Sequence, residues 1–171
     1  MAQTLQKPLL LVDIDGVVSL FGFDPNVCPA GTWCQVDGIA HLLSRRAADH
    51  LLDLAETYEL AWCSGWEEKA NDHLPHLLGV PTLPYLQFDD KEAGVTAGLS
   101  HWKLASIHAH VGEERPVAWI DDDFNEACHA WAAQRPGPTL LHATDPAVGL
   151  DDVAAQALLD WAAGLRDTAA V

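Results

Sequence analysis

The sequence predicts an α/β fold of the doubly wound type, in which a mostly parallel five-stranded sheet has helices on both faces. Three observations lead to this prediction. Short apolar runs lack polar alternation, which is typical of strands buried on both sides. These runs alternate with segments of helical periodicity, as βαβ units require. The 171 residues contain no repeat or low-complexity linker, and this length fits one domain of three layers covering residues 1–171.

The strands are predicted from apolar runs that end in polar or turn-forming residues. The run at 8–12 ends in Asp13, and the run at 59–63 ends in Ser64-Gly65. The third candidate, at 83–88, is the weakest because prolines flank it. The five predicted strands are 8–12, 59–63, 83–88, 116–120 and 139–142.

Helices and loops are expected between these strands. Ser44 and Ser100 are candidate N-caps, because a serine hydroxyl accepts a hydrogen bond from an unpaired amide of the first turn. The segment 22–31 and the polar segment 89–99 are expected to be loops, whereas 32–43 could form a hairpin that turns at Asp37-Gly38. We therefore expect a flap-like insertion at about 22–43. The predicted helices cover 44–57, 66–78, 100–111, a segment ending near 133, and 151–164.

The charge balance limits the classes of partner. Lys and Arg total 9 against 25 Asp and Glu, for a formal net charge of −16. Extended binding to a nucleic-acid backbone or to an anionic membrane needs a basic face, so both are disfavoured. A small anionic substrate remains compatible with this charge, because one bound metal ion can invert the charge of a local site.

The N-terminal residues and the cysteines predict a cytoplasmic protein. No stretch reaches the roughly 20 apolar residues of a membrane span, and residues 1–8 do not resemble a signal peptide. The four cysteines form no CxxC pair, as expected for reduced thiols. A zinc site built from Cys28, Cys34 and histidines is the alternative.

Polar residues with catalytic potential follow three of the predicted strands. The first strand leads to Asp13 and Asp15, the second to Ser64 and Gly65, and the fourth to the run at 121–123. Each has an ordinary structural explanation when taken alone, such as a helix cap or a turn. Ligands of open α/β sheets bind beyond the carboxyl ends of the strands, so these groups together predict a functional site. Lys103, expected near the start of the helix before the fourth strand, would join them.

Four segments in this order resemble the motifs of the haloacid dehalogenase superfamily. The apolar strand and DxDG of residues 10–18 resemble the first motif, and the strand ending in Ser64 resembles the second. Lys103 resembles the helix-borne lysine of the third, and 117–122 resembles the fourth, a strand followed by two aspartates. The resemblance covers roughly residues 8–142. The segments CSGWE, AWIDD and DPAVGL further resemble small domains of this superfamily that are grouped with "Swiss Army Knife" RNA-repair proteins.

The resemblance implies a phosphatase that works through a phosphoaspartyl intermediate. Asp13 would be the nucleophile, and Asp15 would protonate the leaving group and then activate water. Ser64 and the Gly65 amide would bind the phosphoryl group, and Lys103 would balance the negative charge. Asp15 favours this activity over dehalogenation, because a leaving halide needs no acid.

The resemblance also implies a Mg²⁺ site, since carboxylate and carbonyl oxygens are the ligands this ion prefers. Asp13, the Asp15 backbone carbonyl, and either Asp121 or Asp122 would hold the ion. Asp121 is our first choice because it lies nearest the apolar run. Asp123 is expected to cap the next helix.

The length of the chain leaves no room for a cap domain over this site. An open site suits nucleotides, nucleic-acid ends or other bulky phosphorylated substrates. Trp33 and Trp66 lie near the predicted site and could stack on a base or sugar, or could simply pack against the sheet. A haloacid dehalogenase-fold binding or regulatory module without turnover, a phosphotransferase, and a response-regulator receiver are the alternatives. A receiver is disfavoured because its phosphorylated aspartate ends a middle strand.

Overall fold

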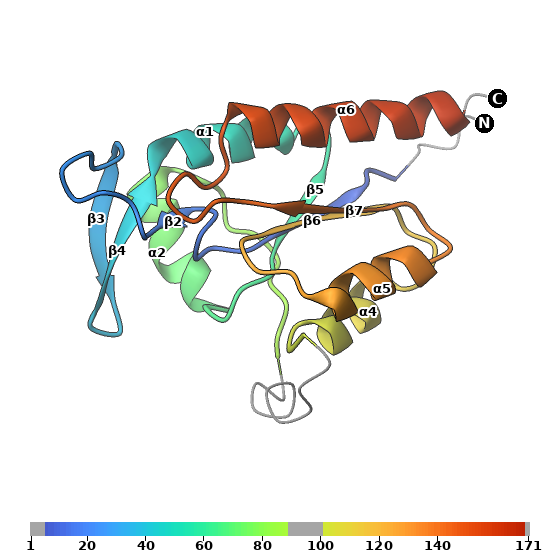
Figure 1. Cartoon of the computed structure of the whole chain (residues 1–171), viewed down its shortest axis with the longest axis horizontal. Helices are drawn as coiled ribbons and strands as arrows, with labels where there is room; N and C mark the ends of the chain where they lie inside the picture. Colours follow the sequence, from blue (N-terminus) through green and yellow to red (C-terminus); the bar gives the residue numbers. More distant parts are fainter. Residues whose placement is uncertain (1–5, 89–100, 170–171) are drawn as a thin grey trace.

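The computed structural model describes residues 6–88 and 101–169. Its centre is a parallel sheet of four strands in the order β5-β1-β6-β7 (Figure 1). Val12 pairs with Trp62 on one side and with Ile120 on the other, so three neighbouring strands end level with one another. This level edge brings together the residues that follow β1, β5 and β6. The strands are β1 (Leu9–Val12), β5 (Glu59–Trp62), β6 (Val117–Asp121) and β7 (Thr139–Ala143).

Helices cover both faces of this sheet, which confirms the predicted three-layer α/β class (Figure 1). Leu10 and Val12 of β1 pack in one buried cluster with residues of α1, α2 and α6. Leu9 and Leu11 point the other way, into a second cluster with residues of α4 and α5. Alternate residues of a strand face opposite sides, so an apolar run without alternation supplies both layers. The helices are α1 (Arg45–Leu54), α2 (Lys69–Leu78), α4 (Leu104–Val111), α5 (Glu126–Gln134) and α6 (Asp152–Ala169).

The predicted third strand at 83–88 is reduced to a single parallel bridge between Tyr85 and Trp62. The backbone hydrogen bonds of this bridge run from Trp62 N–H to the Pro84 carbonyl and from Leu86 N–H to the Trp62 carbonyl. Pro84 has no N–H, so the ladder cannot continue through it. The described parallel sheet therefore has four strands instead of the predicted five, and this segment packs beside β5 as its edge.

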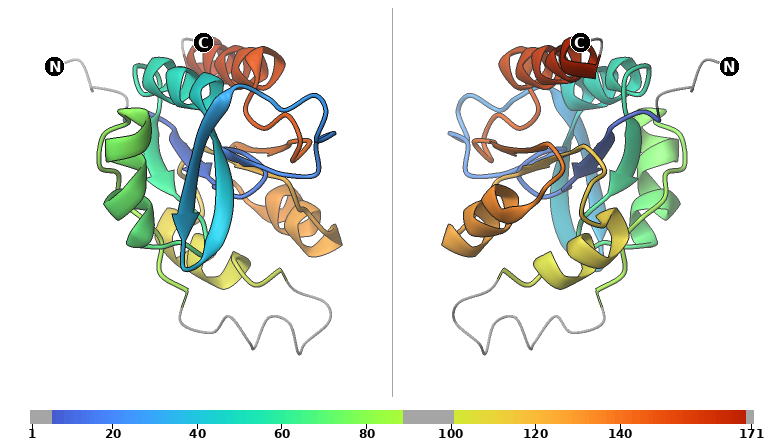
Figure 2. Two further views of the ribbon diagram at one scale, coloured as in Figure 1. Left: turned by 90° about the vertical axis from the view of Figure 1, so that its left-hand side faces the viewer. Right: turned by 90° about the vertical axis from the view of Figure 1, so that its right-hand side faces the viewer.

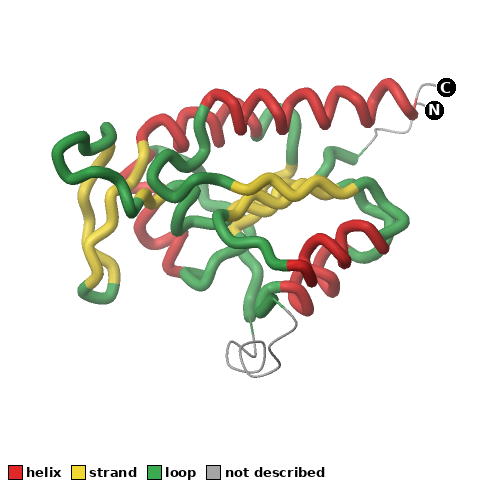
Figure 3. The backbone as a smooth tube through the Cα atoms, in the orientation of Figure 1, coloured by secondary structure: helices red, strands yellow, loops and turns green. Residues whose placement is uncertain are grey.

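The predicted hairpin is present and lies beyond the carboxyl ends of the parallel strands (Figures 1 and 2). It consists of β3 (Gly31–Val36) and β4 (Ile39–Ser44), and β4 also pairs with β2 (Ser19–Leu20). Asp37 and Gly38 form the turn, with φ of 52° and 80°. Two consecutive positive φ angles match a type I′ turn, the form that fits the twist of a hairpin. Figure 3 shows this small antiparallel sheet set apart from the central one.

One of the two predicted N-caps that the structure describes is confirmed and the other is wrong. Ser44 caps α1 as predicted, because its hydroxyl accepts a hydrogen bond from Ala47 N–H at 3.1 Å. Asp123 does not cap α5. The N-cap is Asn125, whose side chain accepts from Cys128 N–H at 3.2 Å.

The remaining helix boundaries differ by a few residues from those predicted. The second helix begins at Lys69 instead of residue 66, and the last continues to Ala169. The predicted cap Ser100 and the predicted loop 89–99 lie outside the described residues, and α4 begins at Leu104. Within 6–88 and 101–169, no helix combines the length and apolar character needed to cross a bilayer.

Candidate active site

A pocket of about 290 Å³ lies at the carboxyl ends of β1, β5 and β6. Asp13 directly follows β1, Ser64 lies just after β5, and Asp121 is the last residue of β6. The structure brings every predicted site residue except Trp66 to the wall of this pocket. Its lining residues are Asp13, Asp15, Ser64, Gly65, His101, Trp102, Lys103, Asp121, Asp122 and Asp123.

Lys103 lies between two buried carboxylates. Its Nζ is 2.9 Å from Asp13 Oδ1 and 2.6 Å from Asp121 Oδ2. Burial alone would lower the pKa of Lys103, but the two carboxylates outweigh that effect and hold the pKa above its usual value. The ammonium group is therefore charged at neutral pH. It links Asp13, which follows β1, to Asp121 at the end of β6.

The carboxylates around Lys103 carry more negative charge than the lysine offsets. Burial, and then the nearby charge of Asp121, raise the pKa of Asp13 to about 7 despite the attraction of Lys103. The same two causes raise the pKa of Asp122 to about 6. Ionisation of the whole group is unfavourable in the protein alone, so the pocket favours a bound cation.

Asp13, Asp121 and Asp122 each present an oxygen, and these oxygens lie within 4.8 Å of one another. Hard carboxylate oxygens fit Mg²⁺ better than they fit zinc. Within the part of the chain that the structure describes, this is the one cluster of three or more potential metal-binding side chains, and neither Cys28 nor Cys34 belongs to it. The alternative zinc site is therefore not formed.

Asp121 is already engaged by three donors. Its Oδ2 accepts hydrogen bonds from Lys103 and from the Trp119 indole N–H at 3.0 Å, and its Oδ1 accepts from Asp123 N–H at 3.2 Å. Asp122 is half-buried and lies against the turn that follows β1. Asp121 was the first choice from the sequence, and the choice between Asp121 and Asp122 as a cation ligand stays a prediction.

Gly16 allows the close approach between this turn and Asp122. Its φ is 79°, and a Cβ atom there would lie 2.5 Å from Asp122 Cγ. A side chain at this position would meet both a strained backbone and a steric clash. The glycine of the DxDG motif therefore has a direct structural role at the carboxylate cluster.

Asp15 lies at the mouth of the pocket with its side chain 48% exposed. The Trp66 indole N–H donates a hydrogen bond to Asp15 Oδ2 at 3.1 Å. His41, from the hairpin strand β4, places its Nδ1 at 3.5 Å from Asp15 Oδ1. The sequence did not indicate His41, because its proximity depends on how the hairpin folds over the sheet.

Trp66 is only 8% exposed, and the rings of His41 and His73 lie 4.8 and 6.3 Å from it. This burial leaves little ring surface for the predicted stacking on a base or sugar. The structure favours packing with a hydrogen bond to Asp15. Trp33, by contrast, is 59% exposed on β3 of the hairpin.

Ser64 and Gly65 follow β5 as predicted. Ser64 is 1% exposed, and its hydroxyl accepts a hydrogen bond from Trp66 N–H at 3.3 Å. Both residues line the pocket. Their role in phosphoryl binding stays a prediction.

His101, Trp102 and Trp119 also contribute, and the sequence prediction missed these contributions. His101 Nδ1 accepts from Lys103 N–H at 3.3 Å, and its Nε2 lies 3.1 Å from the Asp123 carbonyl. Burial lowers the pKa of His101, which fits a neutral ring with Nε2 protonated. The Trp102 ring centre is 5.2 Å from Lys103 Nζ. The sequence signal for these contacts was the pair of ring-bearing residues, His101 and Trp102, directly before Lys103.

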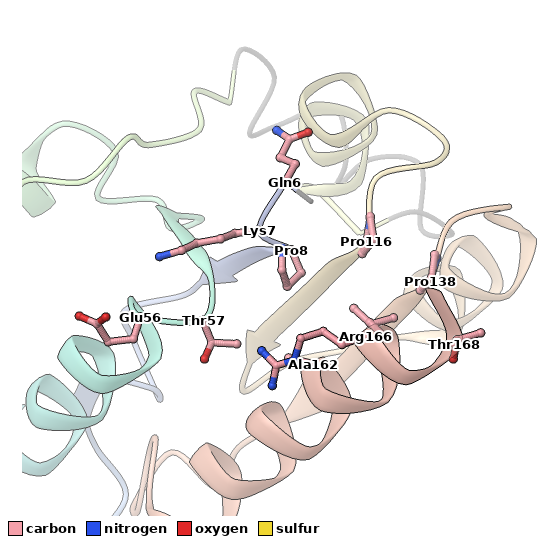
Figure 4. Close-up of a pocket in the computed structure, with 11 residues that line it drawn as sticks. Gln6, Lys7, Pro8, Glu56, Thr57, Pro116, Pro138, Ala162, Arg166 and Thr168 are labelled. Atoms are coloured by element: carbon pink, nitrogen blue, oxygen red, sulfur yellow. The ribbon is translucent and has the colours of Figure 1, made fainter. Parts of the chain in front are cut away.

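A second and larger pocket, of about 500 Å³, lies at the opposite end of the sheet (Figure 4). Pro8, Pro116 and Pro138, which precede β1, β6 and β7, are among its lining residues. It therefore lies at the amino ends of the strands, away from Asp13. Its larger size does not make it the candidate active site, because the carboxylates and the buried lysine meet at the other end.

Comparisons with known proteins give likenesses among solved structures. No protein-family model and no curated protein matches the sequence. The chain is similar to a solved structure described as "putative 3-deoxy-D-manno-octulosonate 8-phosphate phosphatase from Vibrio cholerae". The TM-score is 0.44 and the identity is 18%, with 95% of this chain and 86% of the other chain covered. The function of this protein is therefore inferred from the residues of its own site.

Proposed function

We propose that the protein is a phosphomonoester hydrolase that acts through a phosphoaspartyl intermediate. One observation supports this proposal above the others. A buried carboxylate, Asp13, is paired with the buried ammonium of Lys103, while a second carboxylate two residues later, Asp15, is half-exposed at the same pocket. This arrangement supplies a nucleophile, a compensating charge and an acid-base group to one substrate phosphorus.

The first step transfers the phosphoryl group to Asp13. An Asp13 carboxylate oxygen attacks phosphorus and forms the new P–O bond. The bond from phosphorus to the leaving-group oxygen breaks, and its electron pair stays on that oxygen. Asp15, protonated at this stage, gives its proton to the leaving oxygen.

The second step regenerates the enzyme. Asp15, now a carboxylate, removes a proton from a water molecule as the water oxygen attacks phosphorus. The bond between phosphorus and Asp13 breaks, which releases inorganic phosphate and restores the Asp13 carboxylate. The same residue acts as acid and then as base, so no other proton carrier is needed.

The buried lysine favours the ionised form of Asp13 and offsets the charge of the bound phosphoryl group. Lys103 Nζ contacts Asp13 at 2.9 Å, so it lies beside the atoms that react. Ser64 and the Gly65 amide, which also line the pocket, are proposed to hydrogen-bond the phosphoryl oxygens. These groups are held by the ends of the strands, so little reorganisation accompanies the reaction.

Asp13 and Asp122 are the proposed carboxylate ligands of Mg²⁺, with the Asp15 backbone carbonyl as a further ligand. When bound, the ion would polarise the phosphoryl group and neutralise part of its charge. Asp121 is proposed to support this site through Lys103, because its two oxygens already accept hydrogen bonds from three donors. A substitution of Asp122 should therefore weaken Mg²⁺ binding more than one of Asp121.

The proposed substrates are bulky phosphomonoesters, such as nucleotides or nucleic-acid ends. The hairpin of β3 and β4 is the element of the described structure that stands beyond the pocket, and it is too small to enclose a substrate. A net charge of −16 would repel a long polynucleotide, so we infer contact with an end and not with an extended backbone. All four cysteines are free, which fits a reducing compartment such as the cytoplasm.

The test is hydrolysis of an aryl phosphate by the purified protein with Mg²⁺, followed by a screen of nucleotides and of 3′- or 5′-phosphorylated oligonucleotides. Asp13→Asn should abolish turnover, whereas Asp53→Asn, the same change on the exposed face of α1, should leave it intact. Absence of turnover on every substrate, or turnover that survives Asp13→Asn, would contradict the proposal.

Two outcomes would favour the other candidates. Transfer of phosphate to an added alcohol in preference to water would indicate a phosphotransferase. Tight binding of Mg²⁺ and phosphate without turnover would indicate a binding module.

A further inference from the structure

Two side chains outside the proposed reaction hold the carboxylate of Asp15 from different sides. Trp66 donates its indole N–H, the only polar hydrogen of the side chain, to Asp15 Oδ2 at 3.1 Å. His41 Nδ1 lies 3.5 Å from the other oxygen, Oδ1. The two residues come from separate parts of the chain, one from the turn after β5 and one from hairpin strand β4.

The indole of Trp66 is fixed by its surroundings. Trp66 is 8% exposed, and its backbone N–H is bound to the Ser64 hydroxyl. The rings of His41 and His73 approach it at 71° and 87°, in edge-on arrangements. A buried ring held in this way presents its N–H to one point, which is the oxygen of Asp15.

His41 is fixed by the pairing of the hairpin. It lies opposite Cys34 in the register of β3 and β4, and its side chain is 12% exposed. Its Nδ1 is 2.9 Å from the Ser19 hydroxyl, and Ser19 itself forms a bridge with Asp15. The hairpin therefore reaches the acid-base residue through a chain of short contacts.

Asp15 needs such support because its own side chain is 48% exposed and can rotate. An acid must point at the oxygen of the leaving group in the first step, and a displacement of about 1 Å can cost about a hundredfold in rate. We propose that Trp66 and His41 are positioning residues that orient the Asp15 carboxylate toward the leaving group. This inference rests on the proposed hydrolase function, and neither residue is required to touch the substrate.

The experiment compares substrates that differ in their need for an acid. A nitrophenyl phosphate has a leaving group that departs as a stable anion, whereas an alkyl phosphate requires a proton from Asp15. The variants are Trp66→Phe and His41→Phe, which keep a ring but remove the polar atom. Trp131→Phe is the matched control, because its indole N–H faces His108 on the other side of the sheet. The quantity measured is kcat/KM, which reports the steps up to formation of the phosphoaspartyl group.

We expect Trp66→Phe and His41→Phe to lower kcat/KM for the alkyl phosphate by about ten- to a hundredfold. The value for the nitrophenyl phosphate should change by less than about threefold. Trp131→Phe should match the wild type on both substrates. A structural defect would lower both values together, because it would reduce the fraction of folded enzyme.

Equal losses on the two substrates, or no loss on the alkyl phosphate, would overturn the inference. If Trp66→Phe does not fold, the comparison between His41→Phe and the wild type decides the question alone. Failure of the hydrolase proposal would look different, since the wild type would then show no turnover sensitive to Asp13→Asn.

Discussion

The raised pKa of Asp13 predicts that the metal-free protein loses stability as the pH rises. The carboxyl group is 6% exposed, and its pKa is about 7 in the folded protein against 3.8 in the unfolded chain. Between these two values the folded state keeps a proton that the unfolded state has released. The free energy of unfolding therefore falls from about pH 4 to about pH 7 and stays low above it. A difference of about three pK units, at about 1.4 kcal/mol each, corresponds to about 4 kcal/mol.

The assay is urea unfolding, followed by tryptophan fluorescence, in a chelator at pH 5, 6, 7 and 8. Relative to Asp13→Asn, the wild type should lose about 3 kcal/mol between pH 5 and pH 8, which is the part of the effect that falls in this range. Lys103 makes no contribution in this window because it is protonated in both states. Asp122, whose pKa is also raised, adds a slope of the same sign in both proteins. Mg²⁺ should restore stability more at pH 8 than at pH 5, since it binds the ionised carboxylates.

Parallel stability profiles of the wild type and Asp13→Asn from pH 5 to pH 8 would refute this reasoning. So would a wild type that gains stability relative to the variant as the pH rises. Asp53→Asn provides the control for a change of one surface charge, and it should keep the wild-type slope.

Three further substitutions test single features of the site and fold. Gly16→Ala should weaken Mg²⁺ binding by about 10- to 100-fold in calorimetry, because the new Cβ would clash with Asp122, and unchanged affinity would contradict this. Lys103→Met should cost about 3–5 kcal/mol of unfolding free energy at pH 8 in a chelator, and less at pH 5, where Asp13 can be protonated. A loss independent of pH would argue against that account. Asn125→Ala should cost about 1 kcal/mol in urea unfolding by removing the cap of α5, while Asn125→Asp should retain most of that stability.

The central sheet could be predicted because its strands carry a strong local signal. The runs at 8–12 and 116–120 are apolar at every position, and the structure buries them between two helical layers. The hairpin was predictable from the turn dipeptide Asp37-Gly38, whose residues accept positive φ. The segment 83–88 failed as a strand because burial and backbone pairing are separate requirements. Leu86 and Phe88 are buried, but Pro84 cannot take part in a continuous ladder.

The buried carboxylates and lysine could be placed together because parallel strands end at one edge of the sheet. What the sequence could not supply were contacts that depend on side-chain direction between distant segments. Trp66 meets Asp15 across 51 positions of sequence, and His41 reaches it only through the folded hairpin. The hydrogen bond that Trp119 donates to Asp121 was likewise hidden, because Trp119 is an ordinary apolar residue in the sequence pattern.

The hairpin register has a consequence for redesign of this protein. His41 faces Asp15 because it pairs with Cys34, and side chains of a strand alternate between faces. Inserting one residue into the Asp37-Gly38 turn would shift the pairing and turn the imidazole to the opposite face. Exchanges at the exposed positions Trp33 and Ile39 preserve the pairing. A library aimed at new substrates should therefore vary these exposed positions at constant loop length.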